Sequence, residues 1–252
     1  MKFLFIYISI LLLIVSCEDT TPVRENPLDE EGGDYIIPII DLSDIAEGDT
    51  LFSETIQFNL SGNELVSEYR YKYDSYGWVD WNEQGSITLN YLDEGDHQLS
   101  VQSRYLNGDT SEIIRVSFVV DAVSGPSLMF FPRRHIAQQN ETVTFQIMAE
   151  EVVDLMLTEI HLVYDPSMLE VITVTQGSFF QNGQNSIFLN EINSEAGSLQ
   201  INTALLDGEV LSVDGTGDLV NLQVKLLQSG STTISFNGSD AFIDPNNNDI
   251  LL

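Results

Sequence analysis

The chain has 252 residues, of which 43% are hydrophobic and 10% aromatic, so it holds enough apolar side chains for packed cores and is not wholly disordered. Nine lysines and arginines stand against 39 aspartates and glutamates, and the formal net charge is -30. Because nucleic acids and anionic membrane surfaces are bound through basic patches, this charge argues against both kinds of partner.

The first 17 residues have the pattern of a secretory signal peptide. Lys2 precedes the apolar run Phe3–Val15, which is shorter than the roughly 20 residues of a membrane-spanning helix. The run ends in IVSC, residues 14–17, which resembles a bacterial lipobox. The resemblance implies lipidation of Cys17, which is the only cysteine and therefore has no disulfide partner in the chain. An ordinary cleaved signal peptide is the alternative interpretation.

Residues 18–34 have no periodic apolar pattern and combine prolines and glycines with many acids. We predict an acidic, flexible tether there. The pair Glu18-Asp19 resembles the surface-export tag of some lipoproteins. These features predict a protein of the bacterial cell envelope that is lipid-anchored in the outer membrane and touches it only through the anchor. Exposure at the cell surface stays an open possibility.

From Tyr35 onward, short runs of alternating apolar and polar residues recur between turn signals, and no stretch has sustained helical spacing. The sequence therefore predicts an all-β fold of two β-sandwich modules in tandem, at 35–121 and 127–252, joined by a linker at 122–126. The predicted strands are 55–60, 68–73, 86–90, 97–105, 113–120, 127–131, 142–149, 157–164, 169–175, 186–192, 198–206, 217–227 and 231–236.

The segments YRYKYDSYGWVDW, LNYLDEGDHQLSVQSRYLNGD and VSFVVD of the first module resemble immunoglobulin-like modules of bacterial surface and sensor proteins. Trp78 and Trp81 lie in the densest aromatic cluster of the chain. They could form a platform on which sugars stack. Alternatively the cluster is structural, because Tyr69, Tyr71 and Tyr73 share one face of a strand and would supply the core of the module.

The most informative stretch is HLVYDPSMLEVITVTQGSFF, residues 161–180. A strand ends at Tyr164, and Pro166 cannot continue it as a central strand because it lacks a backbone donor. Asp165 can accept a local backbone hydrogen bond and close the turn. The stretch, with the later segments GDLVNLQV and GSTTISF in order, resembles the cohesin domain, the β-sandwich module of cellulosome scaffoldins. An unrelated jelly-roll sandwich, such as a carbohydrate-binding module, is the alternative.

The resemblance implies a non-catalytic binding module that holds a dockerin, a small helical module that carries calcium. Alternation predicts that Leu157, Glu159, His161 and Val163 lie on one side of their strand, with Ile160, Leu162 and Tyr164 on the other. Leu157 and Glu159 match the contact positions of the family. On the later strand, Leu199, Ile201, Thr203 and Leu205 would face the core and Asn202, Ala204 and Leu206 would face outward. The predicted partner-binding residues are Leu157, Glu159, His161, Asn202 and Ala204.

Little in the sequence indicates catalysis. His97, His135 and His161 are far apart, and with one cysteine they give a metal site little support. No nucleophile-elbow or phosphate-binding motif is present, so we predict no enzyme activity, no metal and no cofactor. The leading interpretation is a surface-anchored adaptor that captures a dockerin-bearing protein in polysaccharide degradation or surface assembly. The alternatives are a lipoprotein that binds carbohydrate and a structural spacer or sensory lipoprotein.

The last residues, DPNNNDILL, begin like a calcium loop. However, position six from Asp244 is Asp249 instead of glycine, and position twelve would lie beyond Leu252. We predict a turn between strands at 241–243 and 250–252. Cohesin-like modules continue into a last strand that pairs with the first, so we expect 127–131 to lack that partner or to meet only a stub of it.

Overall fold

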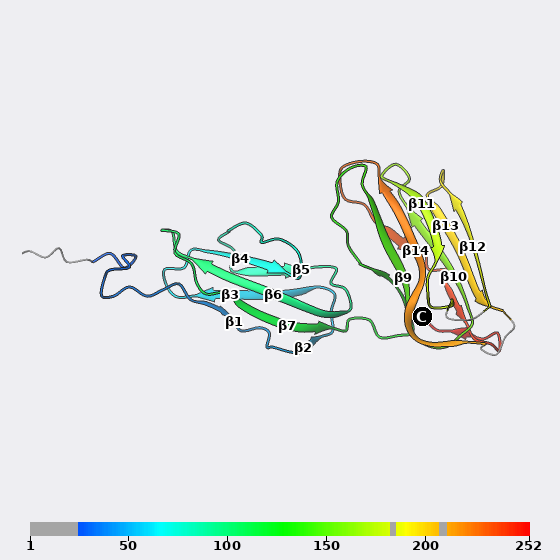
Figure 1. The fold of residues 1–252 in the computed structure, drawn as a ribbon, viewed down its shortest axis with the longest axis horizontal. Coiled ribbons are helices and arrows are strands. Elements are labelled where there is room, and N and C mark those ends of the chain that lie inside the picture. Colours follow the sequence, from blue (N-terminus) through cyan, green and yellow to red (C-terminus); the bar gives the residue numbers. More distant parts are fainter. Residues whose placement is uncertain (1–24, 182–184, 207–210) are drawn as a thin grey trace, which may run out of the picture. The chain divides into compact units, whose positions relative to one another are not determined.

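The computed structural model describes residues 25–181, 185–206 and 211–252. The predicted signal peptide, Cys17 and the first part of the tether lie outside the described residues. All the regular elements of the described part are β-strands (Figure 1). A helix long and apolar enough to span a membrane is absent from these described ranges. The predicted all-β class is therefore confirmed.

The first module is built from two sheets, one with strand order β1-β3-β5 and the other with order β2-β7-β6-β4. The strands are β1 (Ile40–Leu42), β2 (Asp49–Leu51), β3 (Ile56–Gly62), β4 (Glu68–Tyr73), β5 (Ser86–Leu89), β6 (Gly95–Arg104) and β7 (Ile114–Val120). The sequence prediction missed β1 and β2, which have three residues each and are too short to show an alternating pattern. The name immunoglobulin-like for this sandwich stays a prediction.

Alternation places one face of each of these sheets in a common core. Phe58 of β3 and Phe118 of β7 come from different sheets, are each 1% exposed, and have ring centroids 6.0 Å apart. Leu99 and Val101 of β6 are fully buried. They pair with Tyr73 and Tyr71 of β4, so these tyrosines lie on the core side, as the structural interpretation of the aromatic cluster predicts.

The second module also has two sheets, of strand order β11-β14-β9-β8 and β12-β13-β10-β16-β17, with β15 pairing to β10 as well. Its strands are β8 (Ser127–Phe131), β9 (Thr142–Leu155), β10 (Leu157–Tyr164), β11 (Leu169–Gln176), β12 (Ser186–Asn193), β13 (Ser198–Leu205), β14 (Val213–Leu226), β15 (Ile234–Phe236), β16 (Ala241–Ile243) and β17 (Asp249–Ile250). Between the sheets lies a core that includes Ile147, Ile160, Ile201, Leu222 and Phe242.

Two strands of this module are longer than predicted by three residues or more. β9 and β14 each have 14 residues and pair along their whole length, with register shifts near Gly215 and Gly217. The extra residue that each bulge inserts breaks the period of two, which is why the predicted strand ended too early in β9 and began too late in β14.

Among the described residues, the first strand of the second module has a single partner strand. β8 pairs with β9 alone and forms the edge of its sheet, and β17 pairs with β16 instead of β8. The predicted turn between β16 and β17 is also present, with Asn247 at φ 65 and the amide groups of Asn246 and Asn248 bound to Asp244 Oδ1, both at 2.8 Å.

Backbone contacts also divide the chain into two compact units whose borders differ from the predicted linker. One unit takes the described residues up to Asp44 with Asn59–Ser86 and Leu99–Arg115. The other takes Ile45–Phe58, Ile87–Gln98 and Val116–Leu252. The predicted boundaries at 122–126 stay a prediction.

Candidate functional site

The solvent face of the sheet formed by β10, β13 and β12 brings the predicted partner-binding residues together. The exposure of β10 and β13 alternates as predicted: Ile160, Leu162, Leu199 and Ile201 are buried, and the residues between them are more accessible. Antiparallel register then aligns the outward residues of the three strands in rows. The rows are Ile187 with Ala204 and Leu157; Leu189 with Asn202 and Glu159; Glu191 with Gln200 and His161; Asn193 with Ser198 and Val163.

These rows define the surface that we call the β10 face. Leu157 lies directly opposite Ala204, and Glu159 lies directly opposite Asn202. Side chains that face each other across antiparallel strands are about 5 Å apart at Cβ. Four residues singled out from two distant segments therefore form two adjacent cross-strand pairs, and His161 belongs to the next row.

Polar contacts hold Glu159 in place on this face. Gln200 Nε2 donates a hydrogen bond to Glu159 Oε1 over 3.2 Å, and His161 Nε2 lies 3.4 Å from the same oxygen. The side chain of Glu159 is 39% exposed, whereas that of His161 is 21% exposed. His161 Nδ1 is buried and has no hydrogen-bond partner among the described residues. The carboxylate of Glu159 is therefore oriented but still accessible to a partner.

The strand beside His161 is interrupted. β16 pairs with the first part of β10 and β15 with its last part, and residues 237–240 bulge out between them. The Asp240 carboxylate replaces the missing backbone acceptor, because the His161 amide donates to Asp240 Oδ1 over 2.7 Å. The His161 carbonyl in turn accepts from the Asn237 amide over 2.9 Å. The backbone amide and carbonyl of His161 thus both have hydrogen-bond partners, although the neighbouring strand is not continuous there.

The predicted turn after β10 also fixes one end of the face. Asp165 Oδ1 accepts from the amide of Ser167 over 2.9 Å and from its hydroxyl over 2.7 Å, and these bonds lower the pKa of Asp165. The Tyr164 amide donates to the Gly197 carbonyl over 2.8 Å. The turn is thereby tied to the hairpin that joins β12 and β13.

Trp78 and Trp81 are both partly buried, and arginines cover their rings. The Arg70 guanidinium lies 4.6 Å from the Trp78 ring centroid and 4.5 Å from that of Trp81, and Arg104 lies 4.6 Å from the Trp81 centroid. Glu68 accepts a hydrogen bond from Arg104, which lowers the pKa of Glu68. These contacts favour the structural interpretation over sugar stacking, because little of the Trp81 ring is left for a ligand.

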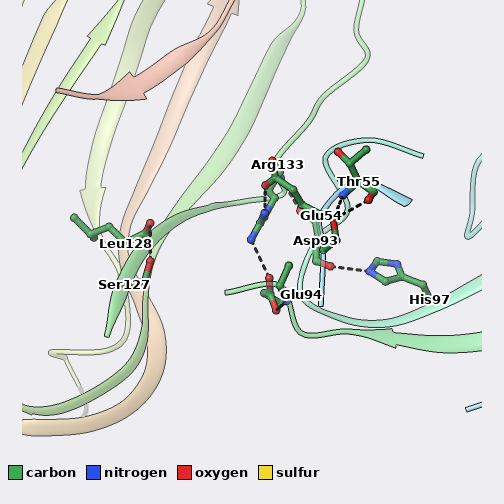
Figure 2. Close-up of polar contacts among 10 residues, drawn as sticks. Glu54, Thr55, Asp93, Glu94, His97, Ser127, Leu128 and Arg133 are labelled. Atoms are coloured by element: carbon green, nitrogen blue, oxygen red, sulfur yellow. Dashed lines mark hydrogen bonds and ion pairs between the residues drawn. The ribbon is translucent and has the colours of Figure 1, made fainter. Parts of the chain in front are cut away.

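A second cluster of charges surrounds Arg133, within the compact unit that includes 116–252. Figure 2 shows Arg133 reaching Glu54 and Glu94, with a distance of 2.9 Å from Nη2 to Glu94 Oε1. Its backbone amide donates to Asp93 Oδ1 over 2.6 Å. Burial raises the pKa values of Asp93 and Glu94, and Arg133 partly opposes this rise. The side chain of Arg133 is 11% exposed, so its charge is already neutralised internally.

The three histidines remain apart. His97 is buried beside Phe118 and contacts the Asp93 carbonyl, and His135 contacts the Thr144 carbonyl. In the described part of the chain, no group of three or more His, Cys, Asp or Glu side chains could hold a metal ion. The β10 face remains the most developed candidate site.

Sequence reasoning missed the contribution of β12 to this site. Ile187 and Leu189 are 38% and 56% exposed and extend the face beyond Ala204 and Asn202. The strand itself was predicted, but its mixed apolar and polar pattern does not reveal which side is buried. Only the register with β13 determines this.

A family model matches most of the second module. The family model of the cohesin domain matches residues 134–251. No protein with a curated description matches the chain. Similar solved structures include the type II cohesin dyad of the adaptor scaffoldin ScaA from Acetivibrio cellulolyticus, which is 14% identical with a TM-score of 0.47 over 84% of this chain and 94% of that one.

Two further structures are similar over about half of the chain. One is a type II cohesin–X–dockerin complex from Acetivibrio cellulolyticus, 17% identical with a TM-score of 0.44, covering 49% of this chain and 88% of that one. The other is a non-cellulosomal cohesin from the archaeon Archaeoglobus fulgidus, 21% identical with a TM-score of 0.36, covering 45% of this chain and 75% of that one. By the family model alone, residues 134–251 are identified as a cohesin domain.

Proposed function

We propose that the chain is a non-catalytic adaptor whose cohesin domain captures a dockerin-bearing protein on the β10 face. The observation that supports this most is the register: Leu157, Glu159, Asn202 and Ala204, expected to contact a partner, lie in two adjacent rows on one accessible face. Apolar groups surrounded by hydrogen-bonding groups are typical of protein interfaces.

The setting of this capture is part of the proposal. Lipidated Cys17 anchors the chain in the outer membrane, the acidic tether and the first module act as a spacer, and the partner takes part in polysaccharide degradation or surface assembly. The calcium belongs to the dockerin and not to this chain. Direct sugar binding is less favoured, because Arg70 and Arg104 already cover the Trp81 ring.

The test is a binding titration of the chain with calcium-loaded dockerin modules encoded in the same genome. We expect Leu189→Asp to weaken binding at least about tenfold, since it places a charge on an exposed apolar position of β12, in the same row as Asn202 and Glu159. The matched control is Ile172→Asp on β11, in the opposite sheet, because Ile172 is 43% exposed and Leu189 is 56% exposed.

Removal of calcium should abolish binding without changing the thermal unfolding of this chain. If none of the dockerin modules binds in the presence of calcium, or if Leu189→Asp and Ile172→Asp bind equally well, the proposed function is wrong.

A further inference from the structure

A groove opens on the second module at a place that contains no residue of the β10 face. Its volume is about 810 Å³, within the range of ligand-binding pockets, and it lies within the compact unit that includes 116–252. β8 borders it on one sheet and β15 on the other. Among the described residues, each of these strands pairs with one neighbour only, so the sandwich is open along this side.

The apolar side chains that line the groove belong to the core but stay partly exposed. On β9, Ile147 and Ala149 are fully buried, whereas Val143 and Phe145 on the same face of the strand are only partly buried. The apolar lining includes Leu128, Phe130, Val143, Phe145, Leu226 and Ile234. One face of β9 is therefore covered at one end and accessible at the other, and the accessible end can receive further apolar side chains.

β8 offers backbone groups to a ligand as well as side chains. It runs from Ser127 to Phe131 between two prolines, and it pairs with β9 on one side only. Half of the backbone N–H and C=O groups of an edge strand point away from its neighbour, so an extended segment can add to the edge. Because side chains alternate along a strand, every second side chain of such a segment would enter the groove.

A free positive charge lies beyond the end of β8. Residues 127–252 contain three lysines and arginines against sixteen aspartates and glutamates. Arg133 is already paired with Glu54 and Glu94. Arg134 lines the groove, is exposed, and takes part in none of the ion pairs or hydrogen bonds found among the described residues. Its charge is therefore left for a ligand to neutralise.

The segment that carries Arg134 is anchored on both sides. The Arg133 amide donates to Asp93 Oδ1 over 2.6 Å. His135 Nε2 lies 2.7 Å from the Thr144 carbonyl oxygen, and its ring packs against that of Phe145 with centroids 4.7 Å apart. The backbone at Arg134 is thus fixed between two anchored neighbours, which lowers the cost of ordering this wall when a ligand binds.

We propose that this groove binds an extended segment of a partner protein, which adds as a strand to the free edge of β8. Apolar side chains at alternate positions of the segment enter the groove, and an aspartate or glutamate beyond them pairs with Arg134. Arg134 follows Phe131 by three residues, which span at most about 10 Å, so the acid lies within a few residues of the last apolar one. The site leaves the β10 face free and is independent of the capture of a dockerin.

The test measures the binding of short labelled peptides to the full chain by fluorescence anisotropy at low salt. Two peptides have alternating valine and threonine, with a pair of glutamates at the first or at the last positions. Matched peptides carry lysines in place of the glutamates. We expect one of the glutamate peptides to bind about tenfold more tightly than both lysine peptides.

Two variants locate the site of binding. Arg134→Glu should weaken binding of the glutamate peptide about fivefold or more, since attraction is replaced by repulsion. Lys225→Glu is the matched control and should leave the affinity unchanged. Lys225 lies on β14 between Val224 and Leu226, which line the groove, so alternation turns it to the other face of the sheet. Thermal unfolding verifies that both variants are folded.

Hydrogen exchange distinguishes strand addition from mere filling of the groove. Backbone amides of β8 should exchange more slowly when the glutamate peptide is bound, because the added strand accepts their hydrogen bonds. The inference holds if this protection accompanies binding that Arg134→Glu weakens and Lys225→Glu does not. It is overturned if neither glutamate peptide binds, if glutamate and lysine peptides bind equally, if the two variants have the same effect, or if binding leaves the β8 amides unprotected.

Discussion

The substitution Gly197→Ala tests how the hairpin of β12 and β13 is held beside the turn after β10. Gly197 has φ +65, and an added Cβ would lie 2.1 Å from the Tyr164 carbonyl oxygen and 2.7 Å from Pro166 Cδ. The first of these atoms is backbone and cannot rotate away. The Gly197 carbonyl also accepts the 2.8 Å hydrogen bond from the Tyr164 amide. Alanine therefore strains the turn and displaces the two segments from each other.

The size of the effect follows from these contacts. A left-handed conformation costs a residue with a Cβ about 1–2 kcal/mol, and loss of the backbone hydrogen bond costs about 0.5–1.5 kcal/mol. We expect a loss of about 2–3 kcal/mol in the free energy of unfolding of the cohesin domain. For a domain of this size that lowers Tm by roughly 8–12 °C.

Intrinsic fluorescence makes the assay specific to one module. The only two tryptophans of the chain, Trp78 and Trp81, lie in the first module, so their fluorescence follows its unfolding, whereas calorimetry detects both modules. Gly197→Ala should lower a calorimetric transition and leave the fluorescence transition in place. Gly215→Ala is the control, since Gly215 has φ +99 but open space around its Cβ position. An equal Tm for Gly197→Ala and the unmodified chain would refute the steric argument.

Three further predictions concern stability. Ile160→Ala should destabilise the cohesin domain by about 2–5 kcal/mol in calorimetry, because Ile160 is fully buried between the outward residues Glu159 and His161. A loss below about 1 kcal/mol would contradict the placement of Ile160 in the core. Trp81→Ala should lower the stability of the first module by about 1–3 kcal/mol, as two arginines lose their ring contact, and an unchanged Trp78 fluorescence transition would contradict this. The Asp165 carboxylate has a lowered pKa in the folded chain, so its ionised form stabilises the fold. This stabilisation is fully present above the unfolded pKa of about 3.9, and it is lost as the pH falls through the lower folded pKa. Tm measured from pH 5 down to pH 2 should therefore fall less for Asp165→Asn than for the unmodified chain, and parallel curves would show that the bonds from Ser167 do not stabilise the fold.

Local patterns predicted much of the cohesin domain. β8, β10 and β16 have the predicted bounds, and the sides of β10 and β13 are as the alternation indicates. The period of two is a property of the extended backbone itself, so it can be read without knowing the neighbours of a strand. The turn at Asp165 was predictable for the same reason, since it depends on proline geometry and on a side chain two residues from its donor.

Other features depend on segments that are distant along the chain. The arrangement of Arg70 and Arg104 over Trp81 joins β4, β6 and the loop between β4 and β5, and no local pattern indicates it. The bulges that lengthen β9 and β14 exist only as a mismatch between two strands. The replacement of a strand by the Asp240 carboxylate beside His161 is likewise a relation between residues 79 positions apart.

The sequence by itself determined the fold class, the alternation of the β10 strand and the cohesin-like order of motifs, because these follow from local backbone geometry and residue type. Only the tertiary structure decided that Glu159 faces Asn202, that Leu189 shares their row, and that Gln200 and His161 contact the Glu159 carboxylate. Register and charge neutralisation are set by non-local pairing, in which a shift of one residue would exchange the two faces of a strand.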